Sequence, residues 1–295
     1  MPDVEPITGR YLRLRVEAEE LRVYMKEAGS GHPLVCLHTA AADTRQYRYV
    51  LTDERIIKDW RVIAFDMPYH GKSNPPDRWW DRSYRLTAAR YEATIMAFCR
   101  ALGLVRPVVM GCSMGGAIVL RLAARHGAEL GGIIGLESAA YAPGRANQFL
   151  HHPAVHGGEM AATCSFGLTA PESQEECRRE NWWYYSQSGP GVYLGDIHFY
   201  SSDWDAREEL GAIDTDRCPV VLLTGEYDYS CTPDMTAEVA RRIPGSRYVA
   251  MEGIGHFPMV ENPRLFIDRY LRPALDDLRG RLKSASGPGL FEETP

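Results

Sequence analysis

Three residues of this chain, far apart in the sequence, have the types that nucleophilic catalysis requires. Ser113 follows the apolar run Val108–Met110, and Asp228 and His256 each follow a later apolar run. A serine hydroxyl becomes a nucleophile when a histidine takes its proton and a carboxylate orients that histidine. The order serine, acid, histidine is the one expected when the serine occupies a sharp turn between a strand and a helix.

The residues around Ser113 predict such a turn. Gly111 and Gly115 flank it in the pattern Gly-x-Ser-x-Gly, at positions where side chains would collide across the turn. The helix-forming segment Ala117–Arg125 follows at once. A serine so placed has its hydroxyl exposed at the edge of a sheet, with a helix N-terminus behind it. We therefore expect Ser113 to be a nucleophile rather than a structural serine of a loop.

The rest of the chain predicts a mostly parallel central sheet flanked by helices, because short apolar runs alternate with helical segments. Catalytic groups in such sheets gather at the C-terminal ends of the strands, which brings Asp228 and His256 toward Ser113. The predicted strands are Tyr11–Ala28 (two strands, the second Leu21–Glu27), Pro33–His38, Trp60–Asp66, Val108–Met110, Gly132–Glu137, Pro219–Gly225 and Arg247–Met251. The predicted helices are Thr87–Leu102, Ala117–Arg125, Thr232–Arg242 and Asn262–Arg281.

One long segment, residues 140–212, breaks this alternation. It is rich in aromatic residues, histidine, glycine and charge, and it holds no clear buried strand. We interpret it as a helical cap inserted into a core made of residues 1–139 and 213–283. Residues 284–295, which begin Ser-Ala-Ser-Gly-Pro-Gly, predict a flexible tail.

Composition limits the partners and the cellular location that we expect. The formal net charge of −6 over 295 residues, with no dense basic run, argues against nucleic acid as a partner. Residues Met1–Glu20 lack a signal-peptide core, and no apolar stretch reaches the length of a membrane span. Seven scattered cysteines without a Cys-x-x-Cys pair predict reduced thiols and a cytoplasmic protein. We expect no cofactor, and a homodimer is left open.

Five sequence pieces resemble the α/β-hydrolase superfamily, in its cap-bearing branch of esterases, lactonases and carbon–carbon bond hydrolases. By that resemblance Ser113 is the nucleophile, His256 the general base and then acid, and Asp228 the residue that fixes the imidazole tautomer. The backbone N–H groups of Met114 and Ala40 would form the oxyanion hole. The pieces are His38–Ala40, Asp66–Ser73, Gly111–Gly116, Gly225–Asp228, and Gly255–Pro258 followed by Glu261–Pro263.

Two positions depart from the family pattern. Thr39 stands where the family usually has glycine, so its hydroxyl either adds a third donor to the oxyanion hole or packs. Tyr69 also replaces a favoured glycine and is expected to narrow one side of the entrance.

Several side chains have competing interpretations. Glu226 rivals Asp228 as the acid, but Asp228 is favoured because it lies beyond the strand end. Arg45 is either a ligand for a substrate carboxylate or a solvated loop residue. Aromatic residues of the insertion either form its core or line the pocket. Its histidines (His151, His152, His156 and His198), with Asp196, match no metal-ligand spacing, so no metal site is expected. The candidate substrate-binding residues are Thr39, Arg45, Trp182, Trp183, Tyr184 and Tyr200.

These features favour a serine hydrolase acting on a small carboxylic ester or lactone. The first alternative is hydrolysis of a carbon–carbon bond in a ring-cleavage diketone, which similar enzymes perform with the same triad. Such substrates need a site for a carboxylate, and the arginines nearest to Ser113 in sequence are Arg106 and Arg121. The second alternative is a ligand-binding receptor on a hydrolase fold. Dehalogenases and epoxide hydrolases need an aspartate at the turn and are disfavoured, whereas haloperoxidase-like and acyl-transfer activities stay open.

Overall fold

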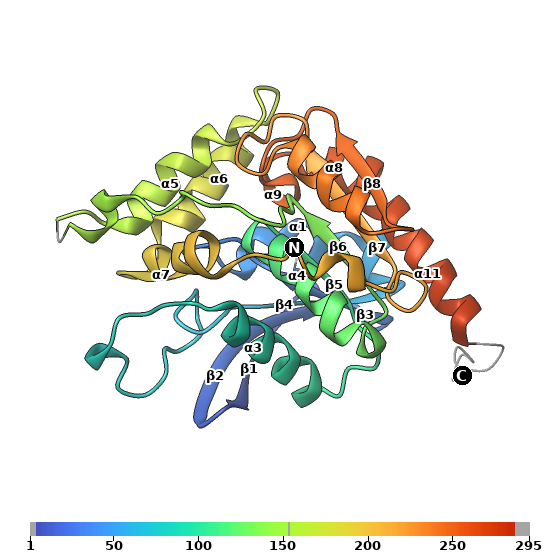
Figure 1. Ribbon diagram of the computed structural model, residues 1–295, viewed down its shortest axis with the longest axis horizontal. Coiled ribbons are helices and arrows are strands. Elements are labelled where there is room, and N and C mark those ends of the chain that lie inside the picture. The colour runs from blue at the N-terminus through green and yellow to red at the C-terminus, as the bar shows by residue number, and fades with distance from the viewer. Residues whose placement is uncertain (1–3, 153, 287–295) are drawn as a thin grey trace.

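Eight strands form one sheet in the computed structural model, which describes residues 4–152 and 154–286 (Figure 1). Their order across the sheet is β1-β2-β4-β3-β5-β6-β7-β8. The pairs β1–β2 and β2–β4 are antiparallel, and every other neighbouring pair is parallel, which confirms the predicted fold class. The strands are β1 (Thr8–Val16), β2 (Glu19–Ala28), β3 (His32–Leu37), β4 (Trp60–Phe65), β5 (Val108–Cys112), β6 (Gly132–Leu136), β7 (Val220–Gly225) and β8 (Arg247–Met251).

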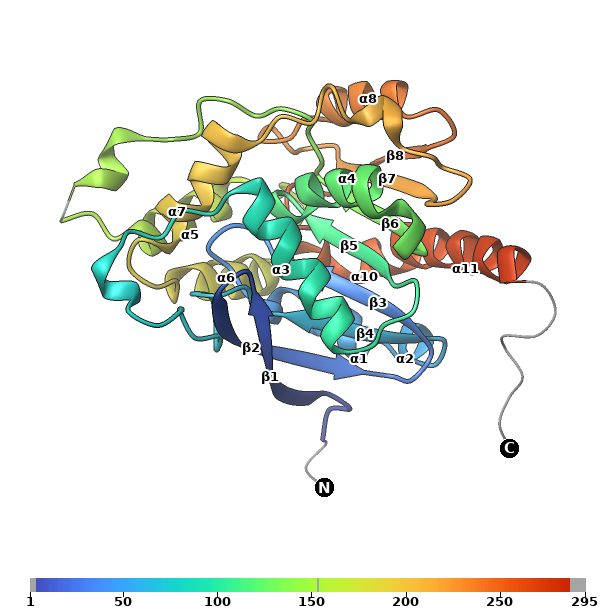
Figure 2. The ribbon, with the colours of Figure 1, turned by 60° about the horizontal axis from the view of Figure 1, so that its bottom comes forward.

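Helices cover both faces of this sheet (Figure 2). Side chains alternate along a strand, so Val35 and Leu37 of β3 pack with Ile95 of α3 and Ile118 of α4, whereas Leu34 belongs to the opposite core. The central strands are therefore continuous apolar runs. The helices are α1 (Arg48–Thr52), α2 (Glu54–Ile57), α3 (Ala88–Ala101), α4 (Met114–His126), α5 (Gly157–Gly167), α6 (Glu175–Ser186), α7 (Val192–His198), α8 (Pro233–Arg242), α9 (Pro258–Glu261), α10 (Pro263–Leu265) and α11 (Arg272–Ser286).

Shorter helical turns complete the structure. Two of them, η5 and η7, are π-helical, and the others are 3₁₀ turns. They are η1 (Thr44–Tyr47), η2 (Trp79–Asp81), η3 (Gly127–Glu129), η4 (Gln148–His151), η5 (Phe199–Asp203), η6 (Leu210–Ala212) and η7 (Phe266–Leu271).

Helix boundaries follow the predicted capping residues, with one correction near the C-terminus. Thr87 caps α3 by accepting the Arg90 N–H at 3.2 Å, and Thr232 caps α8 in the same way. The helix predicted after Asn262 is one unbroken helical run, in which α10 and α11 are joined by the π-helical stretch η7. Residues 284–286, predicted to belong to a flexible tail, are the last turn of α11, and residues 287–295 lie outside the described part of the chain.

The insertion between β6 and β7, residues 140–212, consists of helices and helical turns joined by loops where it is described. Figure 1 shows α5, α6 and α7 grouped on one side of the sheet. Its two ends meet in a single bridge between Tyr141 and Asp205, and the Ala206 N–H donates to the Ala140 carbonyl at 2.8 Å. That the insertion is a separate cap stays a prediction. Within the described residues, no helix has the length and apolar character needed to cross a membrane.

Candidate active site

Ser113 lies in a strained turn between β5 and α4. Its backbone has φ 58° and ψ −111°, a conformation that L-residues rarely adopt. The two flanking glycines make the turn possible. A Cβ on Gly111 would lie 2.3 Å from the Gly115 carbonyl oxygen, and a Cβ on Gly115 would lie 2.7 Å from the Leu37 carbonyl oxygen. The Gly-x-Ser-x-Gly pattern therefore has the steric reason that the sequence indicated.

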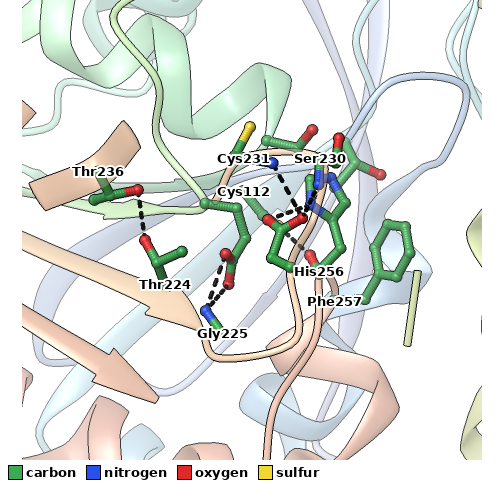
Figure 3. A network of polar contacts seen from close by, with 12 residues as sticks. Cys112, Thr224, Gly225, Ser230, Cys231, Thr236, His256 and Phe257 are labelled. Carbon is green, nitrogen blue, oxygen red and sulfur yellow. Dashed lines mark hydrogen bonds and ion pairs between the residues drawn. The ribbon is translucent and has the colours of Figure 1, made fainter. Parts of the chain in front are cut away.

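Asp228 and His256 come from the loops that follow β7 and β8, and they bind each other. Asp228 Oδ2 lies 2.7 Å from His256 Nδ1, and both side chains are buried. Asp228 Oδ1 accepts the N–H groups of Ser230, at 2.7 Å, and Cys231, at 3.1 Å (Figure 3). Burial by itself would raise the pKa of Asp228, but the charge and hydrogen bond of His256 outweigh it and hold that pKa below its usual range.

The rival acid Glu226 lies elsewhere. Its side chain is exposed and accepts the Gly253 N–H at 3.2 Å, whereas Asp228 binds the histidine. Cys112, next to the serine, is fully buried, and its thiol lies 3.2 Å from the His256 carbonyl oxygen (Figure 3). Burial raises the pKa of the Cys112 thiol well above its usual range, which leaves it an inert core residue.

Ser113 and His256 line one small cavity beneath the insertion. Its volume is about 60 Å³. The Ser113 hydroxyl lies 3.4 Å from the hydroxyl of Tyr200, which comes from η5. The remaining lining residues are Ala40, Arg145, Ala161, Cys164, Ser165, Leu168, Tyr185, Tyr193, Ile197, Ser230 and Phe257.

In the loop after β3, one residue that lines this cavity has a backbone N–H without an acceptor. The Thr39 N–H donates to Gln46 Oε1 at 3.1 Å, and the Ala41 N–H donates to Asp196 Oδ2 at 2.8 Å. Between them, the Ala40 N–H has no acceptor among the described residues, and the same holds for the Met114 N–H at the start of α4. The N–H groups of Ala40 and Met114, the pair expected for the oxyanion hole, are thus free to bind an oxyanion, and their role there stays a prediction.

Asp196 of α7 ties the insertion to this loop, a role the sequence did not reveal. Besides the Ala41 N–H, its buried carboxylate binds His70 Nε2 at 2.8 Å and accepts the Tyr84 hydroxyl at 2.8 Å. Burial opposes the charge on His70, but Asp196 outweighs it and raises the pKa of His70. The nearby His38 has no such partner, so burial and the His70 charge lower its pKa to about 4.

Glu137, immediately after β6, is a second buried carboxylate beside the predicted triad. Leu136 pairs with both Cys112 and Leu223, so the ends of β5, β6 and β7 lie side by side. Both oxygens of Glu137 accept the Gly225 N–H, at 3.0 and 3.1 Å (Figure 3). Its carboxylate lies within 4.8 Å of the ligand-type atoms of Asp228 and His256.

Glu137, Asp228 and His256 have atom types that also bind metals, so we consider which of these atoms already have partners in the protein. The Asp228 carboxylate and His256 Nδ1 already bind each other, and Glu137 binds the backbone of β7. The insertion residues weighed as metal ligands are not brought together, because Asp196 is buried against His70 while His151 and His152 are exposed. His256 Nδ1 and both carboxylates of the trio therefore already have partners within the protein.

Of the predicted substrate-binding residues, Tyr200 alone lines the cavity. Trp182 and Trp183 are exposed on α6, and the Tyr184 hydroxyl donates to Glu180. The Thr39 hydroxyl is engaged by Gln46 and Tyr185, so it packs rather than serving as a third oxyanion donor.

Two loop residues also lie away from the cavity. Arg45 binds Asp43 and Gln187 over a different hollow. Tyr69, with φ 75°, packs against Tyr84 with ring centres 4.4 Å apart and is not among the residues that line the cavity. Tyr185 and Tyr193, which also line the cavity, belong to the aromatic residues of the insertion for which a pocket role was one of the two interpretations. Arg145 was missed because nothing in its sequence spacing relates it to Ser113.

Comparison with known proteins agrees with this geometry. The family model described as the alpha/beta hydrolase fold matches residues 32–263. The AB hydrolase superfamily protein YisY of Bacillus subtilis (strain 168) is 26% identical over 266 residues, covering 84% of this chain and 92% of the relative. A thermophilic esterase from Thermogutta terrifontis has a TM-score of 0.80 at 20% identity, covering 93% of this chain and 100% of that chain. An enol-lactonase from Burkholderia xenovorans LB400 has a TM-score of 0.76 at 19% identity, covering 92% and 100%.

Proposed function

Because this chain belongs to the alpha/beta hydrolase fold family, we propose that it hydrolyses a small carboxylic ester or lactone through an acyl-enzyme intermediate. The observation that supports this most is the convergence of Ser113, His256 and Ala40 on one cavity, with Asp228 bound to the far nitrogen of the histidine. The likeness to an esterase and an enol-lactonase supports the same reaction class at the level of the fold.

In the proposed reaction, the Ser113 hydroxyl attacks the substrate carbonyl while His256 Nε2 takes its proton. Asp228 holds the Nδ1–H tautomer and stabilises the imidazolium that forms. The N–H groups of Ala40 and Met114 bind the tetrahedral oxyanion and together contribute about 3–4 kcal/mol. His256 then protonates the leaving alkoxide, and a water molecule deprotonated by His256 releases the acid.

The strained turn at Ser113 is suited to nucleophilic catalysis. A positive φ at Ser113 costs about 1–3 kcal/mol, and such strain persists where it aims a side chain into a site. The turn also leaves the Met114 N–H at the helix N-terminus, where the helix dipole favours negative charge. The small cavity favours a short acyl group over a long chain.

Steady-state turnover of a substrate panel tests the proposal. The wild type should hydrolyse short methyl esters and small lactones with many turnovers per chain, and Ser113→Ala should lose essentially all of this activity. Ser186→Ala is the matched control and should keep the wild-type rate, because Ser186 is a half-buried serine at the end of α6 whose hydroxyl donates to the Trp183 carbonyl. Retention of the wild-type rate in Ser113→Ala overturns the proposal.

The same panel separates the alternatives. Turnover of vinylogous diketones in place of esters would identify carbon–carbon bond hydrolysis. A single slow turnover with tight product retention would identify a ligand-binding receptor. Both outcomes contradict the ester or lactone proposal.

A further inference from the structure

Arg145 gives the cavity a chemical preference that the proposed function alone does not specify. It lies at the start of the insertion and lines the same cavity as Ser113 and His256. Of all the described residues that line this cavity, Arg145 alone carries a permanent charge. A substrate entering here therefore meets one fixed positive charge and otherwise neutral walls.

The contacts of Arg145 leave that charge without an anion. Its Nη1 donates to the Ser230 hydroxyl, and its Nη2 donates to the Ser230 carbonyl and, at 3.5 Å, to the Cys231 thiol. All of these acceptors are neutral. Within the described residues, Arg145 forms no ion pair. The carboxylate that helps to raise its pKa is that of Asp228, which is already bound to His256.

Arg121, another partly buried arginine, differs from Arg145 because two carboxylates pair with it. Its side chain is 16% exposed, and it pairs with Glu92 at 2.5 Å and with Glu209 at 3.1 Å. A charge removed from water is costly unless an opposite charge compensates it. Arg145 is positioned to obtain that compensation from a bound molecule.

Tyr200 contacts both the Arg145 guanidinium and the Ser113 hydroxyl. The Arg145 guanidinium lies over the Tyr200 ring at 4.7 Å from its centre, and the hydroxyl of the same ring lies 3.4 Å from the Ser113 hydroxyl. One tyrosine side chain thus spans the distance between the cation and the nucleophile. A short molecule can reach both at once.

From these contacts we infer that the substrate carries a carboxylate, separated by a few carbon atoms from the scissile carbonyl, and that Arg145 binds this carboxylate. The inference rests on the proposed function and names its substrate class, a small anionic half-ester or carboxylated lactone. The guanidinium donates charge-assisted hydrogen bonds to the carboxylate while Ser113 attacks the carbonyl at the other end. Binding at Arg145 also holds the carbonyl near the nucleophile, which favours reaction over mere association.

A matched pair of esters tests the inference. Monomethyl glutarate carries a carboxylate, and methyl 5-amino-5-oxopentanoate has the same length with a neutral amide. Methanol release gives kcat/KM for each, and their ratio cancels any loss that a variant suffers on both. The wild type should prefer the anion by about 10- to 100-fold, the range expected for hydrogen bonds to a charged group.

Substitutions of Arg145 should change that ratio in a set order. Arg145→Met should bring it to about one, and Arg145→Lys, which keeps the charge but loses the planar fork, should give an intermediate value. Arg179→Met, an exposed arginine on α6 paired with Glu175, should leave the wild-type ratio unchanged. A wild-type ratio near one, or a preference that persists in Arg145→Met, overturns the inference.

Failure of the inference and failure of the proposed function are distinguishable. Hydrolysis of both esters at equal rates contradicts the carboxylate inference but agrees with the esterase proposal. Absence of all ester and lactone turnover sinks the esterase proposal, and glutarate binding measured by calorimetry then decides the inference. Binding weakened at least 10-fold in Arg145→Met supports it, and binding that is absent or unchanged overturns it.

Discussion

The carboxylates of Glu137 and Asp228, which leave the sheet from neighbouring strands, lie within 4.8 Å of one another beside His256. Two buried carboxylates this close do not both ionise readily, because each disfavours the charge on the other. Asp228 keeps its charge through His256, whereas burial and the Asp228 charge hold the pKa of Glu137 well above its usual range. We therefore predict that Glu137 is the protonated member of the pair.

This relationship predicts how Glu137→Gln changes stability with pH. A carboxyl group whose folded pKa is raised loses stabilisation as the pH climbs from its unfolded value, near 4.5, through its folded value. Glutamine has the shape of the protonated acid and does not titrate, so it escapes this loss. Glu137→Gln should match the wild type in Tm near pH 5 and exceed it increasingly up to pH 8. Each unit of pKa elevation corresponds to about 1.4 kcal/mol.

The exposed Glu208→Gln is the control for that experiment, and its Tm difference from the wild type should be small at every pH. A Tm difference for Glu137→Gln that is constant with pH, or that has the opposite sign, would show that Glu137 is ionised in the folded protein.

The His70–Asp196 pair predicts the pH dependence of the contact between insertion and core. The folded pKa of His70 is raised above its usual value of 6.5, so the pair stabilises the fold fully below that value and loses its effect as the pH rises through the folded pKa. His70→Gln removes one partner of a buried pair, which costs about 3–5 kcal/mol. The free-energy loss, measured by urea unfolding, should be largest at pH 6 and smaller at pH 9. A loss that grows with pH would contradict the assignment.

Gly115→Ala tests whether the turn at Ser113 needs glycine beside it for steric reasons. Its added Cβ would meet the Leu37 carbonyl oxygen at 2.7 Å, so β3 or α4 must shift and the Ser113 hydroxyl with it. We expect a fall in kcat of about 100-fold or more, since a misplacement of about 1 Å is enough for that. Gly211→Ala, whose Cβ meets nothing within 4 Å, should keep wild-type activity. Equal activity of the two variants would remove the steric argument.

The two acids after β7 give a second contrast. Asp228→Asn keeps the shape of the side chain but no longer selects the Nδ1–H tautomer of His256, and kcat should fall on the order of 10⁴-fold. Glu226→Gln, which alters only an exposed contact with the Gly253 backbone, should change kcat less than about threefold. A larger effect of Glu226→Gln than of Asp228→Asn would reassign the acid.

Features set by local pattern were predictable from sequence, and those set by long-range packing were not. The strand Arg247–Met251, the caps Thr87 and Thr232, and the turn at Ser113 follow from nearby residue types, and the structure has them. Arg106 and Arg121 were the arginines nearest to Ser113 in sequence, yet Arg145 reaches the cavity because the insertion folds back over the sheet.

Buried polar partners were equally invisible in the sequence. In the sequence, Glu137 is only the end of a predicted strand, and Asp196 is only an acid considered together with the histidines of the insertion. Their roles depend on contacts with β7 and with the loop after β3, which are distant in sequence. The aromatic run of α6 misled in part, because Trp182 and Trp183 are exposed whereas Tyr185 is buried and lines the cavity.

Active-site labelling with a fluorophosphonate, read by intact mass and peptide mapping, tests the central claim most directly. We expect one adduct per chain, located on Ser113, with no adduct in Ser113→Ala and labelling at least 100-fold slower in His256→Ala, where the hydroxyl remains but its base is gone. An unlabelled wild type, an adduct on another residue, or an equal rate in His256→Ala would contradict the account.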